Sequence, residues 1–214
     1  MYRMGLLMVV LGCAGPVSGS VILESGNFTG TYTGLGSHVA NPSQYLGWRF
    51  TLPTDTHITS FGATLYLSTI ACPCTGTTVF GAIVPIADMS SFPGTPNTFT
   101  PLVTALLSPP VGYTAGSLTT ATVSATLSAG TYALVFGSGR FGATAAQWGA
   151  MANIGSTPYA ANTMLLGNTS TDTWGAWTNG NYYFVAGDAV PEPGSLPMAL
   201  LGLGLAVLGR RRVL

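Results

Sequence analysis

The side chains that could perform metal or thiol chemistry are few and poorly spaced. Cys72-Pro73-Cys74 places two thiols one residue apart, and His38 and His57 are the two histidines of the 214-residue chain. A structural zinc site needs four ligands at recognisable spacings, and no motif joins these four residues. We therefore predict that the chain binds no metal and no other cofactor.

Cys72 and Cys74 should be oxidised if the chain leaves the cytosol. Extended residues i and i+2 lie about 7 Å apart, which is the upper limit of the Cα separation that a disulfide bridges. A local bridge therefore needs a bent backbone and closes a very small loop. A local disulfide, unpaired or intermolecular thiols, and metal or redox chemistry remain the three alternatives.

No pattern of a hydrolytic enzyme is present. The sequence has no G-x-S-x-G and no H-E-x-x-H, and the histidines stand in polar contexts, Ser37-His38 and Thr56-His57, typical of a surface. Glycoside hydrolysis needs two carboxylates on opposite sides of a sugar, whereas the acids are scattered along the chain. We predict no catalytic residue, and a secreted hydrolase is the least favoured alternative.

The segment Gly137-Ser138-Gly139-Arg140-Phe141-Gly142 fits the dinucleotide-binding pattern G-x-G-x-x-G. That pattern needs a following helix, a parallel strand and an acid about 20 residues further on. Here the surroundings predict β-strands, and Asp172 lies 30 residues after Gly142. We expect a loop at one end of a β-sandwich, with Arg140 and Phe141 as candidate contacts.

Aromatic residues gather late in the chain, and Asn179-Gly180 predicts a type I′ turn. That turn would pair residues 174–178 with residues 181–185 in a hairpin. Outward-facing aromatic rings can pack against sugar rings, so Trp174, Trp177 and Tyr182 are candidate glycan contacts. The favoured alternative is that these rings fill the core or stiffen the last hairpin.

Charge is sparse between Ser20 and Ala189. This region has two cations, Arg49 and Arg140, and no lysine. Its five acids are Glu24, Asp55, Asp88, Asp172 and Asp188, so its net charge is 2 − 5 = −3. Binding to phosphates needs clustered Lys and Arg, which excludes a nucleic-acid partner. Neutral Thr, Ser, Asn and Gly side chains must form most of the surface.

Short apolar and β-branched runs between Gly, Pro, Asn and Ser predict an all-β body. The candidate strands are residues 21–24, 28–33, 45–52, 58–67, 77–86, 118–127, 131–136, 163–166 and 182–186. Their number suits an antiparallel, jelly-roll-like β-sandwich. Residues 118–127 alternate as a half-solvated strand does, and Ala129-Gly130 should turn them into a hairpin with residues 131–136. The proline-rich residues 89–113 predict an ordered loop or an edge excursion.

The N-terminus has the order of a secretory signal peptide. Arg3 precedes an apolar stretch from Met4 to Leu11, and the small residues Val17-Ser18-Gly19 follow. We expect a signal helix over residues 1–19, export by the Sec machinery and cleavage after Gly19. A lipoprotein signal with an acylated Cys13 is the alternative.

The C-terminus has the order of a membrane anchor. Residues 196–208 are apolar or small and would span about 20 Å as a helix, less than the roughly 30 Å of a bilayer core. Arg210, Arg211 and Arg212 follow and favour a cytoplasmic C-terminus. Pro191, Pro193 and Pro197 keep the segment before the helix extended. We expect transient anchoring in the inner membrane.

The tail resembles the PEP-CTERM sorting tail of Gram-negative bacteria. The resemblance rests on Val190-Pro191-Glu192-Pro193, the hydrophobic helix over residues 196–208 and the basic cluster, which occur in that order at the C-terminus. It implies that an exosortase, a membrane-embedded cysteine transpeptidase, recognises Pro191-Glu192-Pro193 and cleaves nearby. An ordinary C-terminal anchor is the alternative.

These features divide the chain into a signal peptide (residues 1–19), an extracytoplasmic β-sandwich (20–188) and a sorting tail (189–214). The resemblance implies delivery to the cell surface or to an exopolysaccharide matrix. We therefore expect an exported matrix or envelope protein without catalysis of its own. A carbohydrate-binding module is the alternative from another class.

Overall fold

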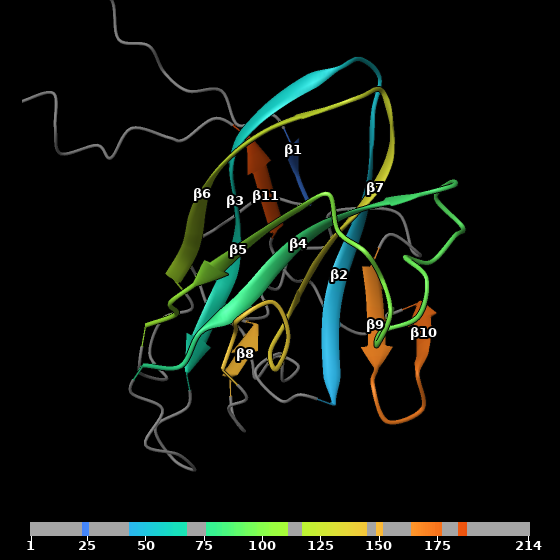
Figure 1. The fold of residues 1–214 in the computed structure, drawn as a ribbon. Helices are drawn as coiled ribbons and strands as arrows, with labels where there is room; N and C mark the ends of the chain where they lie inside the picture. Colours follow the sequence, from blue (N-terminus) through green and yellow to red (C-terminus); the bar gives the residue numbers. More distant parts are fainter. Residues whose placement is uncertain are drawn as a thin grey trace, which may run out of the picture. The chain divides into compact units, whose positions relative to one another are not determined.

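Two antiparallel β-sheets form the part of the chain that the computed structural model describes (Figure 1). This part comprises residues 23–25, 43–67, 76–110, 117–144, 149–151, 164–176 and 184–187, all within the compact unit Ser20–Ala189. Its strands are β1 (Leu23–Glu24), β2 (Gln44–Leu52), β3 (Thr56–Leu67), β4 (Val79–Ile86), β5 (Val103–Leu107), β6 (Ser117–Leu127), β7 (Gly130–Gly137), β8 (Gly149–Met151), β9 (Met164–Asn168), β10 (Thr173–Ala176) and β11 (Phe184–Gly187).

One sheet has the strand order β1-β11-β3-β6, with β8 also paired to β3, and the other has the order β10-β9-β2-β7-β4-β5. The edge strands β5 and β6 contact one another, which closes one side of the molecule. The prediction of an all-β antiparallel fold is confirmed, and the arrangement is sandwich-like because one core lies between the two sheets. The expected signal helix, C-terminal helix and strand at residues 28–33 lie outside the described residues.

The chain crosses between the sheets through two tight arches. Residues 53–55 lead from β2 into β3, and residues 128–129 lead from β6 into β7. The arches are tied together, since the Ala129 amide donates to Asp55 Oδ1 at 2.8 Å. The Tyr132 hydroxyl also donates to the Ser128 carbonyl at 2.7 Å. We call this end of the molecule, formed by residues 53–55 and 128–129, the arch end.

The predicted hairpin between residues 118–127 and 131–136 is wrong, because β6 pairs with β3 while β7 pairs with β2 and β4. The burial of the two strands explains the separation. In β6 the exposed residues Leu118, Thr120, Thr122, Ser124 and Thr126 alternate with inward ones, as predicted. In β7 every residue from Tyr132 to Gly137 is buried, so this strand fits the centre of a sheet covered on both faces.

The predicted hairpin around Asn179-Gly180 is also wrong. β10 pairs with β9 in the six-stranded sheet, while β11 pairs with β1 and β3 in the other sheet. The turn between β9 and β10 is built by Asn168, whose Oδ1 accepts the amides of Ser170 at 2.9 Å and Thr171 at 3.2 Å. All four residues of β11 are buried, which suits a strand inside a sheet.

Strands β5 and β8 were not among the candidate strands. β5 lies inside the proline-rich segment, and it forms the edge of the six-stranded sheet. That position agrees with the predicted edge excursion, because an edge strand tolerates prolines on either side.

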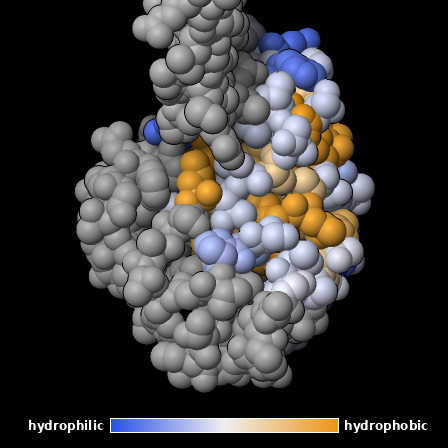
Figure 2. Space-filling model, turned by 90° about the vertical axis from the view of Figure 1, so that its left-hand side faces the viewer, coloured by the Kyte–Doolittle hydropathy of each residue, from blue (hydrophilic) through white to orange (hydrophobic). Residues whose placement is uncertain are grey.

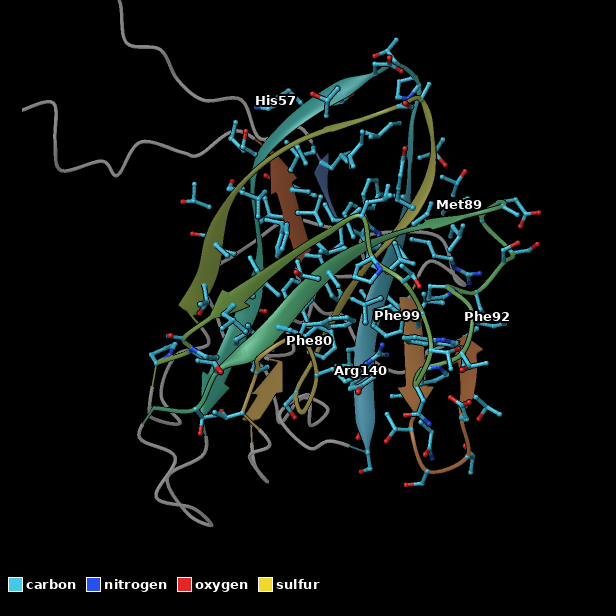
Figure 3. The ribbon with its side chains drawn as sticks, in the orientation of Figure 1. His57, Phe80, Met89, Phe92, Phe99 and Arg140 are labelled. Carbon is cyan, nitrogen blue, oxygen red and sulfur yellow. The ribbon has the colours of Figure 1, made fainter. Side chains whose placement is uncertain are left out.

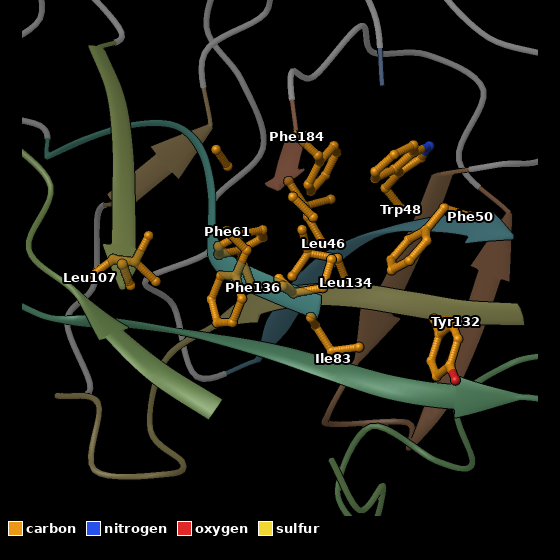
Figure 4. Packing of buried hydrophobic residues seen from close by; sticks show 14 of the residues in the cluster. Leu46, Trp48, Phe50, Phe61, Ile83, Leu107, Tyr132, Leu134, Phe136 and Phe184 are labelled. Atoms are coloured by element: carbon orange, nitrogen blue, oxygen red, sulfur yellow. The ribbon is translucent and has the colours of Figure 1, made fainter. Parts of the chain in front are cut away.

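Aromatic rings dominate the core between the sheets (Figure 4). Phe184 of β11 packs against Phe136 of β7 with ring centroids 5.7 Å apart, and Phe61 of β3 meets Phe136 edge-on at 6.3 Å. Gly81 of β4 leaves the space that the Phe61 ring fills, since a Cβ at Gly81 would collide with that ring and lie 3.0 Å from Phe136 Cε1. A glycine is therefore required here for the two sheets to approach.

The surface is mostly neutral. On the face shown in Figure 2, apolar patches lie between weakly polar residues, and strongly hydrophilic residues are few. Several exposed threonine hydroxyls pair with one another, including Thr51 with Thr131 at 3.4 Å and Thr171 with Thr173 at 2.7 Å. These hydroxyl groups thus form hydrogen bonds with one another, since each can both donate and accept.

We predict that Gly81→Ala destabilises the body by about 1–3 kcal/mol, because the added methyl group overpacks the contact with Phe61. Gly175→Ala is the matched control, since nothing lies within 4 Å of a Cβ at that exposed position of β10. Urea-induced unfolding followed by tryptophan fluorescence measures both. Equal midpoints for the two variants would contradict the assigned packing between the sheets.

Candidate functional site

A second cluster of buried residues lies on the outer face of the six-stranded sheet, away from the core between the sheets. It contains Tyr45 of β2, Phe80 of β4 and Leu165 of β9, with Phe141 and Trp174 packed against it. Residues 87–102, which connect β4 to β5, run across this cluster, and we call them the strap. Phe99 of the strap is 3% exposed and completes the cluster (Figure 3).

Arg140 fastens one part of the strap. Its guanidinium carbon lies 4.5 Å from the ring centroids of both Phe99 and Phe141, which are themselves 5.5 Å apart, so it packs against both aromatic rings. Its Nη1 donates to the Pro96 carbonyl at 2.6 Å and its Nη2 to the Phe99 carbonyl at 3.2 Å. Cation–π contacts and charge-assisted hydrogen bonds therefore act on the same loop. Burial raises the pKa of Tyr45, and the charge of the neighbouring Arg140 opposes that increase.

Arg49 fastens the beginning of the strap. Its side chain is buried on β2, and its Nη1 donates to the Ser91 carbonyl at 3.2 Å, while Phe92 lies 5.6 Å from the guanidinium carbon. Burial lowers the pKa of Arg49, and the negative charge of Asp88 raises it. The strap thus receives hydrogen bonds from both arginines of the described residues.

The turn at the start of the strap is organised by Asp88. Hydrogen bonds from the Ser90 hydroxyl and amide, and then from Ser91, hold the pKa of Asp88 at about 2. The same Oδ1 atom accepts all four bonds, at 2.6–2.9 Å. Because the pKa is lowered in the folded state, this stabilisation is present above about pH 4 and is lost as the pH falls towards 2.

Two residues in left-handed backbone conformations also serve the strap. Phe141 has φ 51° and Asp172 has φ 53°, and they are the two non-glycine residues with positive φ among those described. Phe141 stacks on Arg140, while Asp172 Oδ1 accepts the Asn97 amide at 2.9 Å. Asn97 in turn donates to the Thr169 carbonyl at 2.8 Å. Strained backbone conformations of this kind persist where surrounding contacts hold them, so the conformation of the strap is well fixed.

The Gly137–Gly142 segment is the loop that the sequence predicts. Gly139 and Gly142 have positive φ values of 75° and 84°, and the segment turns from β7 back towards the strap. The residues that the sequence marked as candidate contacts, Arg140 and Phe141, contact the strap. Arg140 therefore holds the strap in place, and its guanidinium hydrogen bonds go to backbone carbonyls of the strap.

Trp174 is the one candidate glycan contact among the described residues. It is half-buried, its ring lies over Gly167, and its centroid is 6.1 Å from that of Phe99. Its Nε1 atom is buried and has no hydrogen-bond partner in the described part of the chain. These contacts favour a packing role for this ring. The other two candidates, Trp177 and Tyr182, lie outside the described residues, and their role stays a prediction.

The remaining predicted site residues are mostly outside the described part. They are Cys72, Cys74, Val190, Pro191, Glu192, Pro193, Arg210, Arg211 and Arg212. His57 is described and exposed, with Nδ1 3.2 Å from the Thr126 hydroxyl. Within the described ranges, no three His, Cys, Asp or Glu residues come together as metal ligands, and no helix is long and apolar enough to cross a membrane.

The sequence predicts an ordered loop or an edge excursion at residues 89–113, and the strap is an ordered loop, but its attachment to Arg49 and Arg140 was not predicted. The sequence gives only an indirect sign of this attachment. The body has no lysine, and neither of its two arginines stands near an acid in the sequence. Isolated cations of this kind have to be solvated by water or by backbone carbonyls. The sequence does not show which carbonyls these are, because Arg49 and Arg140 lie 42 and 44 residues from their partners.

The described residues thus define a β-sandwich-like body with a clamped outer layer, and the comparisons concern the tail that follows it. The family model of the PEP-CTERM protein-sorting motif matches residues 189–213. A search of the curated proteins found no match to the chain. The match confirms the resemblance seen in the tail and implies an exported protein with a C-terminal sorting tail that an exosortase processes.

We predict that Phe99→Ala destabilises the body by about 3–5 kcal/mol, because it leaves a cavity in the second cluster and removes one ring from Arg140. Phe92→Ala is the matched control in the same strap. Its side chain is 41% exposed, so the loss should stay near 1 kcal/mol. Urea unfolding measures both, and similar losses would mean that the strap does not depend on Phe99.

Proposed function

We propose that the protein is an exported, non-catalytic component of the cell envelope or of an exopolysaccharide matrix, delivered there when an exosortase processes its tail. The single observation that carries this proposal is the PEP-CTERM sorting motif at residues 189–213. The tail supplies the sorting signal, and the sandwich-like body is the part that is displayed. The catalyst of the processing step is another protein.

The expected route follows from the chemistry of the two ends. The signal peptide starts export through the Sec machinery, and the apolar residues 196–208 then stop in the inner membrane. Leucine favours insertion by about 0.3–0.6 kcal/mol per residue, but the interspersed glycines dilute that preference. Arg210, Arg211 and Arg212 stay on the cytoplasmic side. The anchor is therefore weak, as suits a segment that is removed.

The described surface supports a role in a hydrated polymer layer. Neutral hydroxyl groups dominate it, and both described guanidinium groups hydrogen-bond to the strap, so they do not act as free cations towards an anionic partner. Such a surface is wetted without long-range attraction or repulsion. The alternative is a carbohydrate-binding module using Trp174, Trp177 and Tyr182. A glycan array with Trp174→Ala and Trp177→Ala distinguishes that alternative from passive matrix material.

We predict that deleting Leu196 to Leu214 releases the body unprocessed into the periplasm or medium, because the hydrophobic segment and its arginines are the membrane stop. Fractionation of cells that express the full-length and the truncated chain tests this. Deletion of residues 1–19, which leaves the tail intact, is the control, because a chain without the signal peptide should not be exported at all. Identical fractionation of full-length and truncated chains would refute the anchor.

We predict that mature protein from a host with an exosortase lacks Arg210, Arg211 and Arg212, since cleavage near Pro191-Glu192-Pro193 removes everything that follows. Intact-mass spectrometry of the mature protein measures this. The same chain from a host without the enzyme should keep its full tail. An intact C-terminus in both hosts would rule out processing.

A further inference from the structure

The first and the last of the described strands pair with each other (Figure 1). β1 runs antiparallel to β11, with Leu23 opposite Ala186. The pairing continues to Ser25, whose amide donates to the Phe184 carbonyl at 3.0 Å. Ser25 and Phe184 are 159 positions apart in the sequence. This contact therefore joins the two ends of the body, and it can form only when both ends are present.

Ser25 contributes an unusual hydrogen bond to this pair. Its hydroxyl oxygen accepts the Phe184 amide at 2.8 Å, so the side chain takes the place of the main-chain carbonyl that an antiparallel ladder uses. Ser25 is 0% exposed, so water does not reach this bond. An alanine at position 25 would leave the buried amide without this acceptor, which is unfavourable. The closure between the two ends thus depends on one hydroxyl group.

β11 is held firmly by elements other than β1. It pairs with β3 along all four of its residues, and all four are buried. Phe184 packs into the core between the sheets, with its ring centroid 5.7 Å from that of Phe136. The Gly187 carbonyl accepts the Thr59 hydroxyl at 3.0 Å and the Ser60 hydroxyl at 3.2 Å, which fixes the end of the strand on β3. β11 can therefore be in place without β1.

β1, by contrast, depends on β11. It has two residues, both half-buried, and among the described strands it pairs with β11 alone. Leu23 adds a partly buried contact with the core. A ladder of this length has no stability of its own, since even an isolated two-stranded hairpin is marginal in water. The dependence thus runs in one direction, from β1 to β11.

We propose that residues 23–25 and 184–187 form a latch that closes the body in a fixed order, in which β11 docks on β3 and β1 then docks on β11. A chain exported from its N-terminus presents residues 23–25 first and residues 184–187 last. Its N-terminal strand stays open until the last strand has arrived, so a closed latch marks a completely exported body. The latch rests on the proposed function only for the direction of export.

Amide hydrogen exchange, measured by NMR on the full-length chain, tests this order. Successive amides of a strand between two antiparallel neighbours point to opposite sides. The Phe184 amide faces β1, as its bond to Ser25 shows, so the amides of Val185 and Gly187 face β3. Each exchange rate is divided by that of the Phe136 amide in β7, which removes changes in global stability.

Ser25→Ala should speed up exchange of the Phe184 amide about tenfold and leave the two amides that face β3 unchanged, because it opens β1 alone. Ser124→Ala, which removes an exposed hydroxyl on β6, is the matched control and should change none of these rates. Equal acceleration of the amides on both sides of β11 would show that β11 depends on β1, and the proposed order would be lost. No acceleration at all would show that the Ser25 hydroxyl holds nothing.

Phe184→Leu provides the second arm, because it weakens the contact of β11 with the core but keeps an apolar side chain there. It should speed up exchange of the Ser25 amide together with the amides of Val185 and Gly187. An unchanged Ser25 amide in this variant would mean that β1 is held without β11, which contradicts the latch. In refolding from urea with pulse labelling, the wild-type Ser25 amide should gain protection no earlier than that of Val185, and earlier protection would reverse the order. If these results hold but the chain is not exported in cells, the proposed function fails while the latch stands.

Discussion

The outer face of the six-stranded sheet is apolar, and the strap that covers it is held by two guanidinium groups. β2, β4 and β7 have side chains buried on both faces, so without a cover one of those faces would meet water. Arg140 and Arg49 donate hydrogen bonds to backbone carbonyls of the strap. These long side chains thus satisfy carbonyl groups of a loop that have no partner in a sheet. The cost of burying these cations is offset by stacking on Phe99, Phe141 and Phe92.

The strap forms a third layer on the six-stranded sheet. The edge strand β6 of the five-stranded sheet shows one-sided alternation, with mostly hydroxyl residues facing outward, whereas the central strands β2, β4 and β7 of the six-stranded sheet are buried on both faces. Strands with such different requirements do not pair with their neighbours in sequence, so the chain crosses between sheets at both arches. The bond between Asp55 and Ala129 joins these crossings.

The burial pattern of a single strand could be predicted from the sequence, whereas the strands with which it pairs could not. The alternation of residues 118–127 correctly indicated a half-solvated strand, and the prolines near β5 correctly indicated an edge. Turn residues misled at Ala129-Gly130 and Asn179-Gly180, because a turn signal shows that the chain bends but not whether it returns to the same sheet. The apolar run of β7 agrees with its burial on both faces, but such a run does not show which strands pair with it. At the candidate site, Arg140 and Phe141 were singled out, but their partners on the strap depend on contacts between distant residues.

Under the proposed function, the division of the chain between a displayed body and a removable tail accounts for the uneven distribution of charge. The arginines at the C-terminus would act on the membrane and leave with the tail, while the two in the body are bound to the strap. The exposed surface of the described residues keeps a small number of acids among neutral hydroxyls. Such a surface has little electrostatic attraction for a surrounding polymer. The strap contributes to this, because its backbone carbonyls hold the guanidinium groups of Arg49 and Arg140.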